Sequence, residues 1–213
     1  MPSTKRGQLR VHAFGGVRVT DVRGFLGVFE EAYNAVAYFE SSIDGAQRAA
    51  RDMGPGPFWP FFPVGVGLRG RIRVGPASWP PGAAEIASYI TTRERLILHA
   101  VRLESPGFWD FIGKLNPLEV IRQYLVDRHE RRKDREYKEP AEKRRLELEN
   151  KLLENKVVKE RIEIARQLGA TDHDLAPLIN ELVLRPAERL DAYQDGGVIE
   201  VAEFVEDPEK DRR

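Results

Sequence analysis

The longest regular pattern of apolar and polar positions lies between residues 20 and 53. Apolar side chains recur there at steps of three, four and seven residues, the spacing that places them on one face of an α-helix. They are Val22, Phe25, Leu26, Phe29, Tyr33, Val36 and Ile43. Thr20 or Asp21 supplies an N-cap, and Gly54-Pro55 ends the pattern because proline has no N–H to donate. The spacing therefore predicts one helix of about 30 residues with a buried face.

Alternating apolar and polar positions predict strands on either side of this helix. Residues 8–14 alternate and end at Gly15-Gly16. Residues 94–104 form the clearest strand, and apolar residues on both sides of its centre are typical of a middle strand rather than an edge strand. A short helix is expected over residues 83–89, and residues 108–112 are expected to form a compact aromatic turn.

Residues 54–82 differ in kind from the rest of the chain. Seven of the 14 prolines fall between Pro55 and Pro81, and a regular helix is excluded there because each proline removes a backbone donor. Alternation over residues 68–74 is compatible with one edge strand. The aromatic residues of this loop are Phe58, Trp59, Phe61, Phe62 and Trp79. Such a long aromatic loop covers a core, contacts a partner or ligand, or is disordered, and all three interpretations stay open.

A helical pattern then runs from Pro117 almost to Leu168. Asn116 caps it, and proline is tolerated at the first helical position because that N–H has no partner in any case. Of the 23 residues 127–149, 17 are charged, which indicates a helix that stands in water, with a kink near Pro140. An apolar seam follows, short for an independent coiled coil but sufficient for the pairing of two helices. Its members are Leu146, Leu153, Val157, Ile164 and Leu168.

Gly169 ends this helix, and a short amphipathic helix restarts between Thr171 and Asp174. Together the patterns predict an α+β fold, in which a small β-sheet with a packed helix is followed by a long charged helix and a C-terminal helical region. We divide the chain into an α+β domain over residues 1–126, a long charged helix over 127–168, a short helical segment over 169–202 and a polar tail over 203–213.

Composition limits the class of protein but says little about its function. The 213 residues hold 34 Lys and Arg against 34 Asp and Glu, so no net charge draws the chain toward nucleic acid or an anionic membrane. The balance conceals an acidic end, since residues 169–213 carry 5 basic and 12 acidic side chains. The absence of cysteine excludes disulfides, thiolate nucleophiles and Cys-ligated metals. With no apolar run of transmembrane length and no signal-peptide pattern, a cytoplasmic protein is expected.

One motif has the spacing of a nucleotide-binding loop. Residues 65–70 read Gly-Val-Gly-Leu-Arg-Gly, but that motif requires a preceding strand and a following helix, and here a proline-rich loop precedes and a strand-like segment follows. The histidines lack the spacing that brings two metal ligands together on one helix; they are His12, His99, His129 and His173. We therefore expect no cofactor, no metal site and no catalytic residues.

Three hypotheses of function lead, ahead of an enzyme whose active site carries no motif. The first is a protein–protein interaction or scaffold protein that self-associates, as a homo-oligomer, or binds a partner through the long helix and the aromatic loop. The second is a nucleic-acid-binding accessory protein, although interleaved acidic residues oppose its basic helix face, which consists of Arg128, Arg131, Arg132 and Arg135. The third is a peripheral membrane protein that inserts the aromatic residues 58–62 into a lipid surface.

Overall fold

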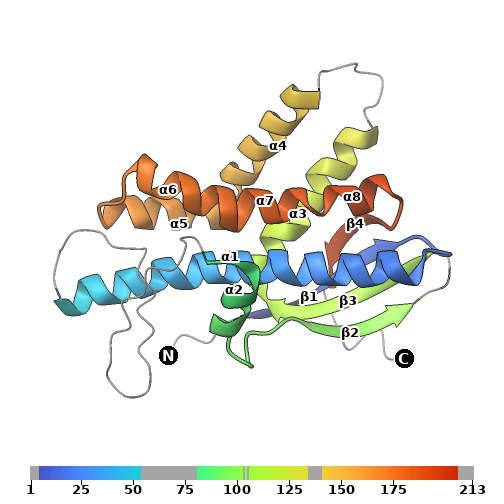
Figure 1. Ribbon diagram of the computed structural model, residues 1–213, viewed down its shortest axis with the longest axis horizontal. Coiled ribbons are helices and arrows are strands. Elements are labelled where there is room, and N and C mark those ends of the chain that lie inside the picture. The colour runs from blue at the N-terminus through green and yellow to red at the C-terminus, as the bar shows by residue number, and fades with distance from the viewer. Residues whose placement is uncertain (1–4, 54–80, 103, 105, 134–140, 206–213) are drawn as a thin grey trace.

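A computed structural model describes residues 5–53, 81–102, 104, 106–133 and 141–205. The fold is α+β, as the sequence predicts. A four-stranded antiparallel sheet has the strand order β2-β3-β1-β4, and helices cover one of its faces (Figure 1). The strands are β1 (Arg6–Ala13), β2 (Ile97–Arg102), β3 (Gly107–Lys114) and β4 (Ile199–Phe204).

Two strand predictions require correction. Within the described residues, the strand expected at 94–104 is not a middle strand, because β2 lies at the edge of the sheet and pairs only with β3. Its apolar side chains fall on both faces yet stay half exposed, so two-sided apolar content did not mean burial. The aromatic turn expected at residues 108–112 is instead the middle of β3, which pairs with β2 on one side and β1 on the other. Trp109 and Phe111 share one face of that strand, the period of two that a turn lacks.

Helix α1 (Val19–Met53) confirms the predicted long helix and forms the core with the sheet. Phe25, Phe29 and Tyr33 on its apolar stripe are fully buried. The Phe29 ring stacks on Phe111 with ring centroids 4.3 Å apart, and the Phe25 ring lies 4.9 Å from that of Trp109. Such pairs add about 0.5–1.5 kcal/mol each to the stability that burial provides. The first half of the predicted apolar stripe, at Phe25, Phe29 and Tyr33, is therefore the face that α1 presents to the sheet.

The two glycines near the start of α1 have different structural reasons. A Cβ atom on Gly24 would lie 2.7 Å from the hydroxyl of Tyr193, which belongs to helix α8 (Asp191–Asp195). Glycine therefore allows α8 to approach α1 closely at this point. A Cβ atom on Gly27 would have no heavy atom of the described residues within 4 Å. The chain tolerates Gly27 without a close approach that requires it.

Replacing Gly27 by alanine is expected to raise the free energy of unfolding by about 0.5–1 kcal/mol, because alanine restricts the unfolded chain and suits a helix. The matched Gly24→Ala variant should show no such gain, since its methyl group displaces the Tyr193 hydroxyl. Urea unfolding of both variants measures the difference. An equal gain in stability for Gly24→Ala would show that the position of the Tyr193 side chain does not require glycine at residue 24.

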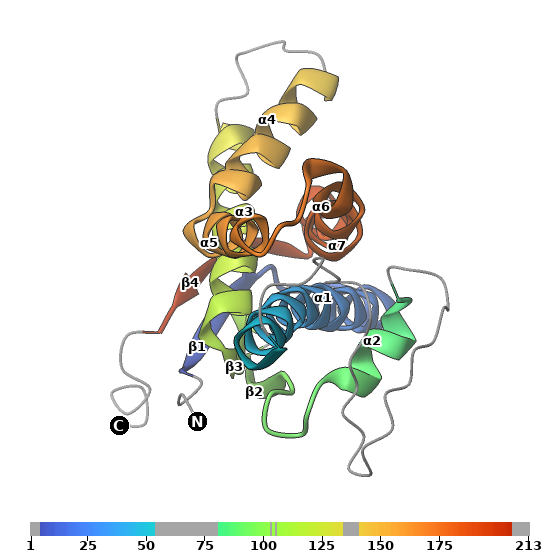
Figure 2. The ribbon, with the colours of Figure 1, turned by 90° about the vertical axis from the view of Figure 1, so that its left-hand side faces the viewer.

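The charged segment, expected to be a long helix that Pro140 kinks or splits, consists of separate helices. Helices α3 (Leu115–Lys133) and α4 (Ala141–Glu154) lie side by side (Figures 1 and 2), and Pro140 lies outside the described residues. A further break separates α4 from α5 (Lys156–Gln167). There the buried Asn155 accepts a hydrogen bond from the Val157 N–H and caps α5, so the chain turns back onto the body of the protein. The Arg161 guanidinium of α5 donates to Asp44 of α1 at 2.5 Å.

The predicted C-terminal helices are present and end with α8. Thr171 caps α6 (Asp172–Ile179) in a capping box with Asp174. A π-helical turn over Asn180–Leu184 (η1) connects α6 to α7 (Arg185–Glu188). Pro186 explains the wider turn, because its ring crowds the carbonyl four residues earlier. The Arg185 N–H accordingly donates to the Asn180 carbonyl, five residues back.

The end of the helical segment was predicted at residue 202, and this boundary is wrong. Residues 199–204 form β4 at the second edge of the sheet, with Ala202 opposite Val11 and Glu203 opposite Arg10 of β1. Two glutamates, three residues apart, interrupt the apolar residues here, and only the pairing with β1 turns that weak pattern into a strand. Ile199 and Ala202 are buried, so the chain end completes the core.

Candidate interaction surface

The predicted apolar seam lies mostly at the rim of the core. Its partly buried members pack against core residues and are Leu153, Val157 and Ile164. Leu168 is half-buried and Leu146 is 51% exposed. The centre of the contact belongs instead to Val158 and Ala165, which are fully buried. The structure therefore uses most of the seam to hold α5 on the body and does not bring its five members together on one free face.

Two arginines of the predicted basic face form ion pairs within the chain. The Arg128 side chain is 11% exposed, with its Nε 2.7 Å from Asp191 and its Nη2 2.8 Å from Asp195. Arg131 Nη1 lies 2.6 Å from Glu147 of α4. Arg132 belongs to α3, but its side chain is not among those described, and Arg135 lies outside the described residues. The charges of Arg128 and Arg131 thus meet carboxylates of the protein itself.

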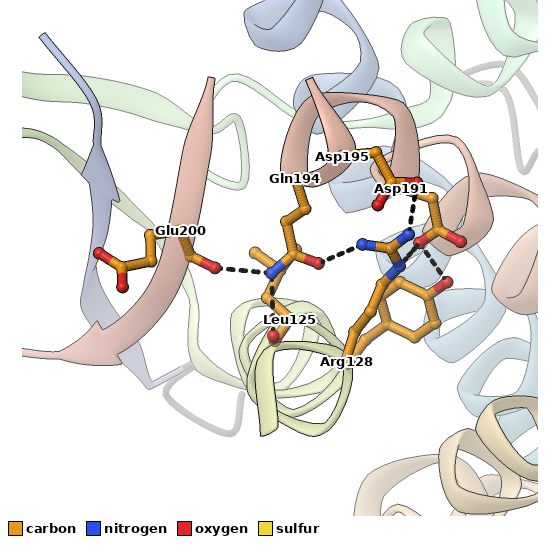
Figure 3. Close-up of polar contacts among 7 residues, drawn as sticks. Leu125, Arg128, Asp191, Gln194, Asp195 and Glu200 are labelled. Carbon is orange, nitrogen blue, oxygen red and sulfur yellow. Dashed lines mark hydrogen bonds and ion pairs between the residues drawn. The ribbon is translucent and has the colours of Figure 1, made fainter. Parts of the chain in front are cut away.

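Figure 3 shows that Arg128 belongs to a polar cluster that fastens α8 and β4 to α3. The Tyr124 hydroxyl donates to Asp191 Oδ1 at 2.7 Å, and the Gln194 amide donates to the carbonyls of Leu125 and Glu200. Burial raises the pKa of Asp191, and the Tyr124 hydrogen bond and the Arg128 charge act in the opposite direction. Tyr124 and Arg128 of α3 contact the same oxygen of Asp191, so the cluster ties α3 to α8.

The predicted contacts of the aromatic loop stay predictions. Phe58, Trp59, Phe61, Phe62 and Trp79 lie outside the described residues, as does the glycine motif at residues 65–70. Within the described ranges, no helix combines the length and apolar character needed to cross a membrane. In the same part of the chain, no three His, Asp or Glu side chains gather closely enough to hold a metal ion.

The edge strand β2 exposes an unusual amount of apolar surface. Seven large apolar side chains of the described residues are exposed, and three of them belong to this one strand. Ile97, Leu98 and Val101 are 46%, 43% and 48% exposed. Leu98 and Val101 lie opposite the core-facing residues of β3, whereas Ile97 lies on the other face of the sheet. We call Ile97–Arg102, with a backbone edge that no described strand pairs and with these three side chains, the β2 edge.

The fold holds the β2 edge firmly at both ends. At its start, the Tyr33 hydroxyl of α1 donates to the Glu94 carbonyl at 2.6 Å and accepts from the Lys114 N–H at 2.8 Å. Burial raises the pKa of Tyr33 to about 12, so this phenol remains a donor at neutral pH. At its end, a Cβ atom on Gly107 would lie 2.6 Å from the Arg102 carbonyl oxygen, so the turn into β3 requires glycine. The β2 edge is thus a positioned element.

The sheet face opposite the helices is polar at its centre. Asp110 of β3 is buried and accepts two hydrogen bonds from Arg10 and one from Gln8. The Arg10 guanidinium also lies over the Phe108 ring at 4.1 Å from its centroid. These contacts neutralise the central charges within the sheet. The apolar surface of this part of the molecule is therefore concentrated at the β2 edge.

A shallow groove of about 450 Å³ lies over the first half of α1, and its geometry does not suit a small-molecule site. Gly24 and Gly27 contribute to its floor, and Arg189 pairs with Glu31 at its margin. Small-molecule sites combine an enclosed apolar cavity with a few converging polar groups. This groove is open, and its most strongly charged margin is occupied by that ion pair. The β2 edge is the better candidate surface.

Sequence reasoning missed this surface because it placed residues 94–104 in the middle of a sheet. The useful signal was the combination of two-sided apolar content with nearby charges, namely Arg95, Arg102 and Glu104. Charged residues at both ends are more typical of an edge strand than of a buried one. That signal is weak, since strand order depends on residues far apart in the chain.

Comparison of the chain with protein-family models, with curated proteins and with solved structures gave no match. Of the surfaces considered, the β2 edge offers both unpaired backbone groups and exposed apolar side chains.

Proposed function

We propose that the protein is a non-enzymatic interaction protein that binds another polypeptide along the β2 edge. The observation that supports the proposal is the exposure of Ile97, Leu98 and Val101 on an unpaired edge strand. An incoming strand satisfies the free backbone groups and covers the apolar side chains at once. The class of function is the one that the sequence favours, but the proposed contact surface is the sheet edge in place of the helix seam and the aromatic loop.

An apolar edge is a liability unless a partner covers it. Natural edge strands are usually protected by lysine, proline, bulges or short length, because an open edge promotes aggregation. Residues 97–102 contain neither lysine nor proline. A register shift at His99 and the charge of Arg102 limit indiscriminate pairing. Covering three half-exposed apolar side chains contributes about 1 kcal/mol each to association, which favours a dedicated partner.

The nucleic-acid hypothesis receives no comparable support from the described side chains. Arg128 and Arg131 would have to leave Asp191, Asp195 and Glu147 before binding phosphate. Breaking the Arg128 pairs would also weaken the attachment of α8 to α3. Binding through this face would therefore oppose the fold rather than use a free surface.

The test compares a Leu98→Lys/Val101→Lys variant with a matched Leu146→Lys variant. Lysine suits an edge strand, and all three leucine and valine side chains are about half exposed, so each variant should fold. Crosslinking mass spectrometry, performed in the cells that produce the protein, identifies the polypeptides attached to the wild type and to each variant. We expect the β2 variant to lose a crosslinked polypeptide, whether a second copy or another chain, that Leu146→Lys retains.

Either of two other results would reject the proposal. Identical crosslinks in all three proteins would show that the β2 edge binds nothing. Loss with Leu146→Lys alone would return the contact to the predicted helix seam. Circular dichroism and thermal unfolding of each variant show whether the fold is intact.

A further inference from the structure

We infer that the polypeptide bound at the β2 edge is a second copy of this chain, paired antiparallel about a two-fold axis between His99 and Ala100. This inference rests on the proposed function of the β2 edge and adds the identity of the partner. The two four-stranded sheets would join into one sheet of eight strands. Each copy would cover the exposed side chains of the other, as an isologous contact requires.

The register shift in β2 makes the strand complementary to itself. Between Leu98 and Ala100 the pairing with β3 skips one residue, so Leu98 lies opposite Phe111 and Val101 opposite Trp109. Leu98 and Val101 therefore lie on the same face, although they are three residues apart. An axis between His99 and Ala100 places Leu98 of each copy opposite Val101 of the other, on the face that carries the helices. Without the shift, this register would pair side chains from opposite faces.

The same register also gives every residue of the strand a partner in the other copy. It uses all six residues of the strand, because Ile97 of each copy then faces Arg102 of the other on the opposite sheet face. An axis through Leu98 or through Val101 would leave part of the strand without a counterpart. The aliphatic stem of arginine can cover the Ile97 side chain while its charge stays in water.

Charge complementarity extends the match beyond the strand. Arg95 precedes the strand and Glu104 follows it, so antiparallel pairing brings Arg95 of each copy to the same end of the strand pair as Glu104 of the other. Both residues are exposed, and Arg95 has no carboxylate within ion-pair distance among the described residues. Glu104 lies 2.7 Å from Arg102 of its own chain and is exposed enough to accept a second cation. Opposite charges therefore meet twice across the axis, whereas a misaligned pair would lose both contacts.

Among the described strands, β2 has one neighbour, β3, and no strand pairs with its other edge. Figure 1 shows the short helix α2 (Ala83–Tyr89) beyond the start of β2 rather than alongside it. The other edge of the sheet differs, because β4 packs against α3 and exposes no large apolar side chain among the described residues. A contact of two β2 edges closes on itself and leaves no apolar edge for further growth.

The experiment measures the mass of the purified full chain by sedimentation, at concentrations up to about 100 μM. We expect a dimer for the wild type and a monomer for Leu98→Lys/Val101→Lys. Arg95→Glu and Glu104→Arg should each weaken the dimer by about tenfold or more, because each single change creates two like-charge contacts. An equimolar mixture of these two variants should restore a dimer of near wild-type affinity, since a heterodimer again pairs opposite charges twice.

A second measurement tests the register directly. The chain has no cysteine, so an introduced thiol can pair only with another introduced thiol. A mixture of Leu98→Cys and Val101→Cys should form a disulfide-linked dimer under mild oxidation, whereas neither variant alone should do so efficiently.

The outcomes separate this inference from the proposed function. A wild type that remains monomeric overturns self-pairing, and the proposed function then stands only if crosslinking finds another polypeptide that the lysine variant loses. A dimer that neither the lysines nor the charge exchange affects assigns self-association to another surface. A dimer that the lysines abolish but that mixing does not restore overturns this register.

Discussion

Replacing Phe25 by alanine is expected to lower the free energy of unfolding by about 3–5 kcal/mol. The Phe25 ring is fully buried and lies 4.9 Å from Trp109 of the sheet and 5.6 Å from Tyr193 of α8, between ring centroids. One side chain thus joins the long helix to both the sheet and the C-terminal helices. Neighbours on three elements cannot all move into the space it leaves, so a cavity remains. Urea unfolding followed by circular dichroism measures the loss.

Phe25→Leu is the matched control, because it removes the ring but keeps the site filled with an apolar side chain. The expected loss is about 1–1.5 kcal/mol. Similar small losses for both variants would contradict the central position of Phe25. A Val19→Ala variant should change little, since Val19 is 84% exposed at the start of the same helix.

Replacing Arg128 by alanine is expected to lower the free energy of unfolding by about 2–3 kcal/mol at neutral pH. The guanidinium is nearly buried and neutralises Asp191 while it bonds Asp195 and Gln194. Without it, the Asp191 carboxylate stays in a partly buried site with Tyr124 as its remaining donor. The loss therefore comes mainly from an uncompensated charge, and the attachment of α8 to α3 weakens with it.

Adding Asp191→Asn to the Arg128→Ala variant should recover part of the lost stability. The asparagine oxygen still accepts the Tyr124 hydrogen bond, but no charge is left in the site. A double variant that is less stable than the wild type by the full sum of the two single losses would contradict this account. Chemical unfolding of the four proteins in the cycle gives the coupling free energy.

The stability that the Arg128→Ala variant loses should depend on pH. Burial raises the pKa of Asp191 in the folded protein, and removing the Arg128 cation raises it further. When the pKa of a carboxyl is higher in the folded protein than in the unfolded chain, the protein loses stability as the pH rises from the lower to the higher of these two values. The reason is that the folded state holds the proton more tightly. The deficit of Arg128→Ala should therefore be largest at neutral pH and decrease toward about pH 5. A deficit that is constant over this range would point to lost packing instead.

The exposed apolar side chains of β2 and the buried charges near Arg128 have different functional meanings. The Arg128 cluster is satisfied within the chain and stabilises the junction of α3, α8 and β4. The β2 edge has apolar groups that the described residues leave half exposed. Variants of the Arg128 cluster should alter stability. Variants of the β2 edge should alter association, with little effect on the free energy of unfolding.

Local patterns in the sequence were sufficient for several elements. The steps of three and four from Val22 to Ile43 predicted α1, since the period of a helix is set by its own backbone geometry. Thr171 and Asp174 marked the start of the C-terminal helices, because a cap depends only on neighbouring residues. The α+β class followed from the mixture of such patterns. The apolar stripe of α1 also identified core residues before any partner was known.

The tertiary structure alone decided which strands are neighbours and which charges meet. The order β2-β3-β1-β4 pairs residue 9 with residues 111 and 204, and contacts across such distances leave no periodic trace in either segment. The predicted phosphate face was lost for the same reason, because Arg128 and Asp191 are 63 positions apart in sequence yet lie 2.7 Å from each other. A strand inside a sheet and a strand at its open edge can have the same amino-acid composition. Whether Leu98 and Val101 face the core or a partner depends on which strand lies beside them, and only folding determines that.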